Sequence, residues 1–282
     1  MFAVGFFVGV FIAAYTVAAE SLFLTKLSHR LNEAFLYAGV FGIISTLFFS
    51  WLQNVIKYSR LTTFTFLAII CITVLLHVGF HSDIFAHDSV LFALYCLTGP
   101  FTALLLLCYW GTFGRLFNFR QSKRIIGWID TGQLIAIILT NFLIPVLSSV
   151  FSVFSDTSNF LFIAIGSIFI ALVLLNILFS SHALLKNDPR EMEKAVRTEL
   201  RFTRIFKDRY VALLSIFLII SMSTLMFAQY SFQTVINKQF PNQKELANFL
   251  GYFNGTTFTL SLAMQAFVNH RIITHYGIRL AL

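Results

Sequence analysis

The sequence has very little charge for its length. Of its 282 residues, 11% are Asp, Glu, Lys or Arg and 58% are hydrophobic, whereas soluble domains carry about 25% charged residues. The few charges separate long apolar runs, and about 20 apolar residues suffice for a helix to cross a bilayer. The composition therefore argues against a soluble globular protein and predicts an all-α integral membrane protein that crosses the bilayer several times.

Cysteine is also scarce. The three cysteines, Cys71, Cys96 and Cys108, all lie in apolar runs, and an odd number at such positions indicates neither a disulfide framework nor a metal site. The seven histidines are scattered. No Gly-rich phosphate loop, nucleophile elbow or pair of catalytic carboxylates is present. We therefore expect a protein that is not an enzyme and that uses no metal or other cofactor.

What the sequence does contain is a series of apolar runs broken by charges. These runs predict eight transmembrane helices, at about 2–24, 35–55, 61–80, 89–113, 126–150, 159–181, 210–236 and 246–269. The links after the second, fourth, sixth and eighth helices hold 16 of the 20 Lys and Arg residues. Because Lys and Arg accumulate in cytoplasmic loops, we expect these links to face the cytoplasm of a bacterial inner (cell) membrane. The bias also accounts for the basic links without a nucleic-acid partner.

The longest link, 182–209, follows six expected helices, and a second set begins after it. Two six-helix halves joined in this way are the organisation of the major facilitator fold. On this interpretation, residues 1–181 form the N-terminal half, 182–209 the cytoplasmic central link, and 210–282 the first two helices of an incomplete C-terminal half. We therefore expect about eight of a presumed twelve helices, in a C-terminally truncated chain of a longer transporter.

Polar side chains within the expected helices are the candidate functional residues, because they are costly in a bilayer and usually face a bundle interior. One face of the first helix carries small and polar residues three or four positions apart, namely Gly5, Gly9, Ala13, Thr16 and Glu20. The glycines predict close helix packing. Glu20 fits two interpretations: a site for a substrate cation or a coupling proton, or an interfacial acid that is solvated or paired with Lys26.

Later helices add further candidates. Gln229 and Gln233 share one arc of the seventh helix, and Asn254 lies in the eighth. Such amides can bind a polar solute, or they can hold helices together at about 0.6 kcal/mol each. The candidate substrate and coupling residues are thus Glu20, Thr16, Gln229, Gln233 and Asn254. Pro100 has no backbone N–H and predicts a kink in the fourth helix.

Residues 122–136, SKRIIGWIDTGQLIA, resemble the AKR..G..G.G...A hinge before the fifth helix of the ATP/ADP antiporter (nucleotide transporter) family, distant relatives of the major facilitator superfamily. The segments AAESLFLTKL, DRYVALLSIFLI and ELANFLGYFNGTTFTLSLAMQAF are similar to bacterial proteins of that wider group. The resemblance is most specific around Lys123, Arg124, Gly127 and Gly251. It implies twelve helices and alternating access, with nucleotide exchange as one candidate activity. Gly251 is a candidate helix-packing residue of the eighth helix, and Gly127 is expected to allow close packing where the fifth helix starts.

Other residues depart from the antiporter pattern. Asp130 and Gln133 stand where the antiporters have small or apolar residues, and the expected helices hold no buried Lys or Arg for a polyphosphate. The last link, NHRIITHYGIRLAL, resembles the superfamily's cytoplasmic loop motif, which joins helices through Arg–Asp contacts. We therefore expect a cytoplasmic gate formed by Arg115, Lys123, Arg124, Asp130, Arg271 and Arg279.

The leading hypothesis is a secondary active transporter that moves a small polar or anionic solute by alternating access. A nucleotide is one candidate solute. The expected partners are the lipid bilayer, the solute and a coupling proton or ion. The alternative hypothesis is a transport-inactive membrane scaffold or sensor on a major facilitator body, with a soluble domain beyond Leu282.

Overall fold

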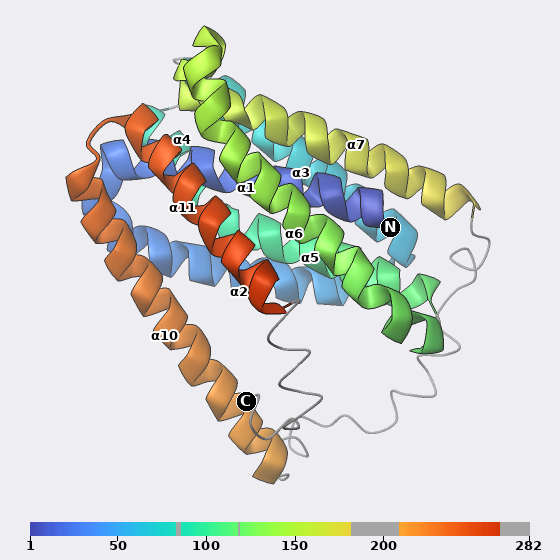
Figure 1. Ribbon diagram of the computed structural model, residues 1–282. Helices are drawn as coiled ribbons and strands as arrows, with labels where there is room; N and C mark the ends of the chain where they lie inside the picture. Colours follow the sequence, from blue (N-terminus) through green and yellow to red (C-terminus); the bar gives the residue numbers. More distant parts are fainter. Residues whose placement is uncertain (83–85, 118, 182–208, 266–282) are drawn as a thin grey trace.

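The computed structural model describes residues 1–82, 86–117, 119–181 and 209–265, and within these ranges it contains helices and no strand (Figure 1). The long helices are α1 (Phe2–Leu27), α2 (Leu31–Val55), α3 (Tyr58–His81), α4 (His87–Cys96), α5 (Thr98–Leu116), α6 (Phe119–Val150), α7 (Phe160–Ser181), α10 (Arg209–Gln239) and α11 (Gln243–Ala263). Short 3-10 turns connect some of them, namely η1 (Ser28–Arg30), η2 (Ser152–Ser155) and η3 (Thr157–Asn159). The expected all-α class is confirmed. Helices suit an apolar chain because they satisfy their own backbone hydrogen bonds.

Six helical stretches in the described ranges are long and apolar enough to cross a membrane. They are Phe2–Val55, Tyr58–His81, His87–Leu116, Ile125–Val150, Thr157–Ser180 and Val211–Gln239. The first contains both α1 and α2, whereas α11, which carries several amides and hydroxyls, is not among the six. This pattern is that of a multi-pass membrane protein. The count of eight spans and the major facilitator arrangement stay predictions.

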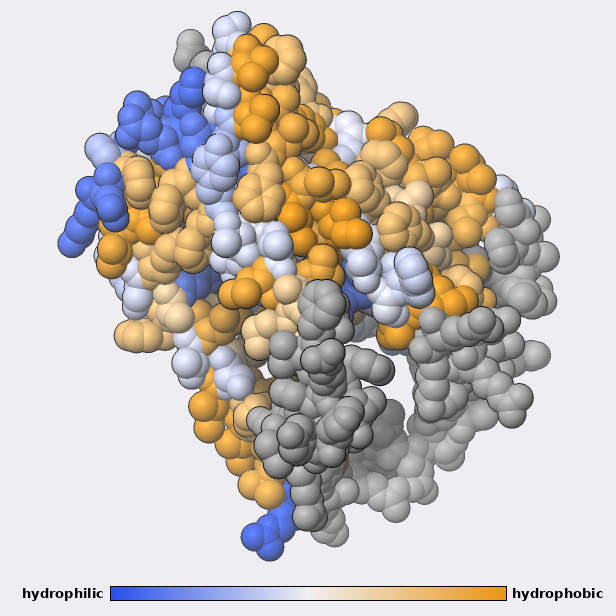
Figure 2. Space-filling view, in the orientation of Figure 1, coloured by the Kyte–Doolittle hydropathy of each residue, from blue (hydrophilic) through white to orange (hydrophobic). Residues whose placement is uncertain are grey.

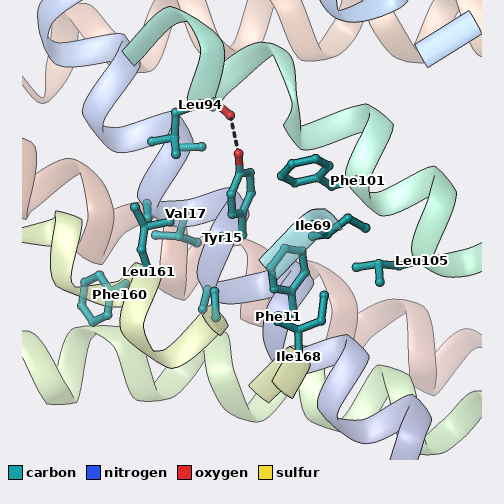
Figure 3. Packing of buried hydrophobic residues seen from close by; sticks show 14 of the residues in the cluster. Phe11, Tyr15, Val17, Ile69, Leu94, Phe101, Leu105, Phe160, Leu161 and Ile168 are labelled. Atoms are coloured by element: carbon teal, nitrogen blue, oxygen red, sulfur yellow. Dashed lines mark hydrogen bonds between the residues drawn. The ribbon is translucent and has the colours of Figure 1, made fainter. Parts of the chain in front are cut away.

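Helix α1 is the centre of the bundle. It packs mainly against α6 and α7, and it also contacts α4, α5 and α11. Figure 3 shows Phe11 and Tyr15 of α1 among aliphatic and aromatic side chains from neighbouring helices. The hydroxyl of Tyr15 donates to the carbonyl oxygen of Leu94 at 3.0 Å. This bond fixes α1 against the end of α4.

The expected fourth helix is divided in two at Leu97, between α4 and α5. Pro100 lies three residues after the division. Because Pro100 has no N–H, it cannot donate to the carbonyl of Cys96, which is its partner four residues earlier in a regular helix. The interruption therefore has a local cause, and it lies beside the carbonyl of Leu94 that receives the Tyr15 hydroxyl.

Helices α6 and α11 pack closely along their lengths. A Cβ atom on Gly251 would come within 2.7 Å of the carbonyl oxygen of Asn141 and 3.0 Å of Cδ of Pro145. The hydroxyl of Ser148 donates to Oδ1 of Asn248 at 2.6 Å. Only a glycine at position 251 lets the two backbones approach this closely.

Helix α10 differs from the others because most of its length is unpacked. Its apolar side chains from Leu213 to Phe227 are exposed, and none of its most apolar segment is buried. Its last turns, from Tyr230 onward, pack against the body near the junction of α1 and α2. Figure 1 shows the first half of α10 diverging from the bundle, and Figure 2 shows its apolar surface at the lower left.

Candidate functional site

A buried acid on α1 meets an amide on α10. Nε2 of Gln233 donates to Oε1 of Glu20 at 3.0 Å, and the hydroxyl of Tyr95 on α4 donates to Oε1 of Gln233 at 2.5 Å. Glu20 is 7% exposed, Tyr95 7% and Gln233 1%. The three side chains form a hydrogen-bonded chain from three helices, which we call the Glu20 cluster.

Aromatic rings surround the Glu20 cluster. The ring of Phe23 stacks on Tyr95 with the centroids 4.3 Å apart, and Phe35 lies edge-on to Tyr230 at 5.5 Å. These contacts exclude much of the water around the cluster and strengthen the electrostatic interactions inside it. An unpaired charge is costly in such surroundings, so the amide of Gln233 stabilises the carboxyl group that it contacts.

Lys26 is not the partner of Glu20. Nζ of Lys26 lies 2.9 Å from Nε2 of His87 and 5.4 Å from the centroid of the Phe80 ring. The interpretation of Glu20 as an interfacial acid paired with Lys26 is therefore wrong. Lys26 lies two turns beyond Glu20, so it meets the segment that begins α4. Among the described residues, no Lys or Arg side chain is buried.

A polar pocket adjoins the Glu20 cluster. It has a volume of about 190 Å³ and is lined by Ser28, His29, Leu31, Asn32, Tyr230, Gln233, Thr234, Asn237 and Lys238. Gln233 is part of both the pocket wall and the Glu20 cluster, so one amide separates the pocket from the carboxyl group. The pocket lies where α1 turns into α2 and where α10 approaches its end.

The other substrate candidates are placed differently. Gln229, one turn before Gln233 on α10, lies near Glu20 although it is exposed. Thr16 is half-buried on α1, one turn before Glu20. Asn254 is half-buried on α11, and no hydrogen bond joins it to the cluster in the described part of the chain. The structure thus brings together Glu20, Gln233 and Gln229.

No family model, curated protein or solved structure matches this chain. The function is therefore inferred from the residues of the site itself. The described residues contain no group of three His, Cys, Asp or Glu side chains that could hold a metal ion.

Two of the six expected gate residues, Asp130 and Arg115, have side chains that the structure describes, and each contacts a group other than a charged gate residue. Asp130 accepts a hydrogen bond from Nε2 of Gln265 at 3.2 Å, and the latter follows the last turn of α11. Arg115 lies on the ring of Tyr58 instead, with Cζ 3.7 Å from the centroid. The side chains of Lys123 and Arg124, and all of Arg271 and Arg279, lie outside the described residues. The contact that the structure assigns to Asp130 therefore links α6 to α11 through an amide.

The candidate packing glycines fall into two groups. A Cβ atom on Gly5 would meet the Tyr109 hydroxyl, and one on Gly9 would come within 2.6 Å of the carbonyl oxygen of Gln133. Gly251 makes the close approach to α6 described above. Around Gly127, by contrast, a Cβ atom would meet nothing within 4 Å. The expected close packing at Gly127 is absent because α6 begins earlier, at Phe119, and Gly127 lies on its open side.

Sequence reasoning missed two residues that matter here. Tyr95 was not a candidate, although its hydroxyl is a polar group inside an apolar run and needs a partner when buried. Pro145 was also overlooked, although it lies inside α6 and packs next to Gly251. Both carried a local signal, but nothing local indicated which residue each would contact.

Proposed function

We propose that this protein is a secondary active transporter that moves a small polar solute by alternating access in a bundle of the major facilitator type. The observation that carries the proposal is the contact between Glu20 and Gln233. It joins α10 to α1 near one end, whereas the first half of α10 remains unpacked. A change between outward and inward access needs helices that are joined by a limited contact. Such a contact can break while the helices themselves stay intact.

The seam between α6 and α11 supports the same proposal. It supplies a second connection between the helices before and after residues 182–208, and it is close-packed at Gly251. A close-packed seam can act as a pivot, and the polar Glu20 cluster can act as the part that opens. We place the links after α2, α5 and α7 on the cytoplasmic side. The Glu20 cluster then closes the bundle on the outer side, and the space between α10 and the other helices is open toward the cytoplasm.

The nature of the solute follows from the charges. A nucleotide carries several negative charges, which buried Lys or Arg residues would have to offset. The described residues bury Glu20 and several amides and hydroxyls but no cation. We therefore propose a small polar solute and assign Glu20 as the group that binds its positive end or carries a coupling proton.

The test is uptake and counterflow in proteoliposomes containing the full protein, with amino acids, sugars, amines and nucleotides as solutes. Glu20→Gln should abolish uptake or remove its dependence on a proton gradient. Glu33→Gln is the matched control, because Glu33 is exposed and paired with Arg30; this variant should transport normally. Absence of transport for every solute class would favour the scaffold or sensor alternative. Unchanged gradient dependence in Glu20→Gln would remove Glu20 as the proton carrier.

A further inference from the structure

A groove between α2 and α5 has an apolar part and a polar end. It has a volume of about 490 Å³. The apolar wall includes Phe49, Ala103, Leu106 and Leu107, and the polar end includes Gln53, Tyr58 and Arg115. Because α2 ends at Val55 and α5 at Leu116, the polar end lies where both helices leave the membrane. The groove therefore changes from apolar to polar along the membrane normal.

Arg115 is held in a fixed position at the polar end. Its guanidinium lies on the Tyr58 ring, and Nη1 donates to the carbonyl oxygen of Gly111 at 3.1 Å. Tyr58 is itself anchored, since its hydroxyl contacts the carbonyl oxygens of Leu107 and Cys108 at 3.0 Å each. The position of the charge is thus determined before any ligand arrives.

This fixed charge lacks an anionic partner in the described part of the chain. Nε of Arg115 is buried and has no hydrogen-bond partner there, and the ion pairs of the described residues involve other groups. A guanidinium has several N–H donors in a planar fork that matches a phosphate group. Nε itself is enclosed, so the N–H groups of Nη1 and Nη2 that are not used in the bond to Gly111 are the donors that suit the phosphate of a ligand in the groove.

We propose that this groove binds an anionic phospholipid, with its phosphate on Arg115 and one acyl chain along Phe49 and Leu106. A phospholipid has the same order of apolar and charged parts as the groove. Trp110 lines the groove between the two parts, and Trp side chains favour this depth in a bilayer. A zwitterionic headgroup fits less well, because none of the described residues that line the groove is a carboxylate able to receive its ammonium group. With the proposed orientation, the lipid belongs to the cytoplasmic leaflet.

Quenching of Trp110 by brominated lipids tests the proposal. The chain has three tryptophans, so the full protein with Trp51→Phe and Trp128→Phe reports from Trp110 alone. It is reconstituted in phosphatidylcholine vesicles with increasing fractions of dibrominated phosphatidylglycerol or dibrominated phosphatidylcholine. Half-maximal quenching should need about fivefold less phosphatidylglycerol, since one basic side chain contributes about that preference for anionic lipid.

Two further variants identify the groups responsible. Arg115→Gln should make the two lipids equivalent, whereas Lys57→Gln, which removes an exposed cation outside the groove, should keep the preference. Ala103→Leu places a larger side chain in the apolar part of the groove, away from Arg115. It should reduce the quenching of Trp110 by both lipids. The folding of Arg115→Gln is checked by its helical circular dichroism. If that variant does not fold, Ala103→Leu still tests whether lipid lies in the groove.

Several outcomes would overturn the proposal. They are equal quenching by both lipids, a preference that persists in Arg115→Gln, and unchanged quenching in Ala103→Leu. The last measurement repeats the quenching experiment in the presence of excess inorganic phosphate as a competitor. If phosphate alone removed the preference for phosphatidylglycerol, the site would be one for a free anion and the lipid proposal would be wrong.

Discussion

Gln233 on α10 donates its amide to the carboxyl group of Glu20 on α1, although 213 positions separate the two residues. Tyr95 on α4 completes the contact by donating to Gln233. The bond is a buried polar connection between α10, most of which is exposed, and the central α1. Whatever conformational change the protein undergoes, separating α10 from α1 must break or replace this bond.

We expect the pair to be energetically coupled. Gln233→Leu and Glu20→Met each remove one partner without leaving a cavity. In a double-mutant cycle their coupling should be about 0.6 kcal/mol and at most about 1.7 kcal/mol, the range for hydrogen bonds between membrane helices. The measurement is the free energy of unfolding in mixed micelles. As a control, Gln243→Leu on α11, whose partner is Thr157, should be additive with Glu20→Met.

Replacing a glycine by alanine should change the stability of the protein in opposite directions at different positions. Gly9→Ala and Gly251→Ala place a Cβ atom 2.6 Å and 2.7 Å from the carbonyl oxygens of Gln133 and Asn141, so each should destabilise the protein by about 1–3 kcal/mol. Gly127→Ala meets open space and should be neutral or stabilising by up to about 1 kcal/mol, because alanine favours helix. Thermal unfolding of the three variants in the same detergent compares them. An equal loss of stability at Gly127 would contradict the open environment described for it.

Tyr15→Phe should lower stability by about 1 kcal/mol. The substitution removes the hydroxyl that donates to the carbonyl of Leu94 and keeps the ring in the core (Figure 3); a buried hydrogen bond contributes about this much. Tyr37→Phe removes the same hydroxyl from an exposed side chain on α2 and should change the unfolding temperature little. If the two variants unfold alike, the bond to Leu94 does not stabilise the division between α4 and α5.

The seam between α6 and α11 can be tested by cross-linking. In a background with Cys71, Cys96 and Cys108 replaced by alanine, Ser148→Cys and Asn248→Cys should form a disulfide on mild oxidation. Their side-chain oxygens lie 2.6 Å apart, and disulfides join residues whose Cβ atoms are about 3.5–4.5 Å apart.

The readout is the shift of the protein band on a non-reducing gel, reversed by a reductant. Pairing Ser148→Cys with Met226→Cys provides the control. Met226 is exposed on the unpacked half of α10, so this pair should remain unlinked. A cross-link between positions 148 and 226 and none between 148 and 248 would place the wrong helix against α6.

Part of the site was predictable and part was not. Glu20 and Gln233 were separately identifiable, because each is a polar side chain in an apolar run, but nothing in the sequence paired them. Asp130 stood out as a lone acid near basic residues, which favoured an Arg partner; within the described residues it accepts a hydrogen bond from the amide of Gln265, and the Arg partner stays a prediction. Gly127 matched a hinge pattern and yet faces open space.

The sequence by itself determined the helical class and the approximate positions of the helices, because both follow from local hydropathy and from breakers such as Pro100. Only the tertiary structure decided that α1 is the central helix, that Arg115 rests on Tyr58, and that Glu20 meets Gln233. Those relationships depend on how distant helices pack against one another. Hydropathy along a single helix contains no information about which neighbour its polar side chains will meet.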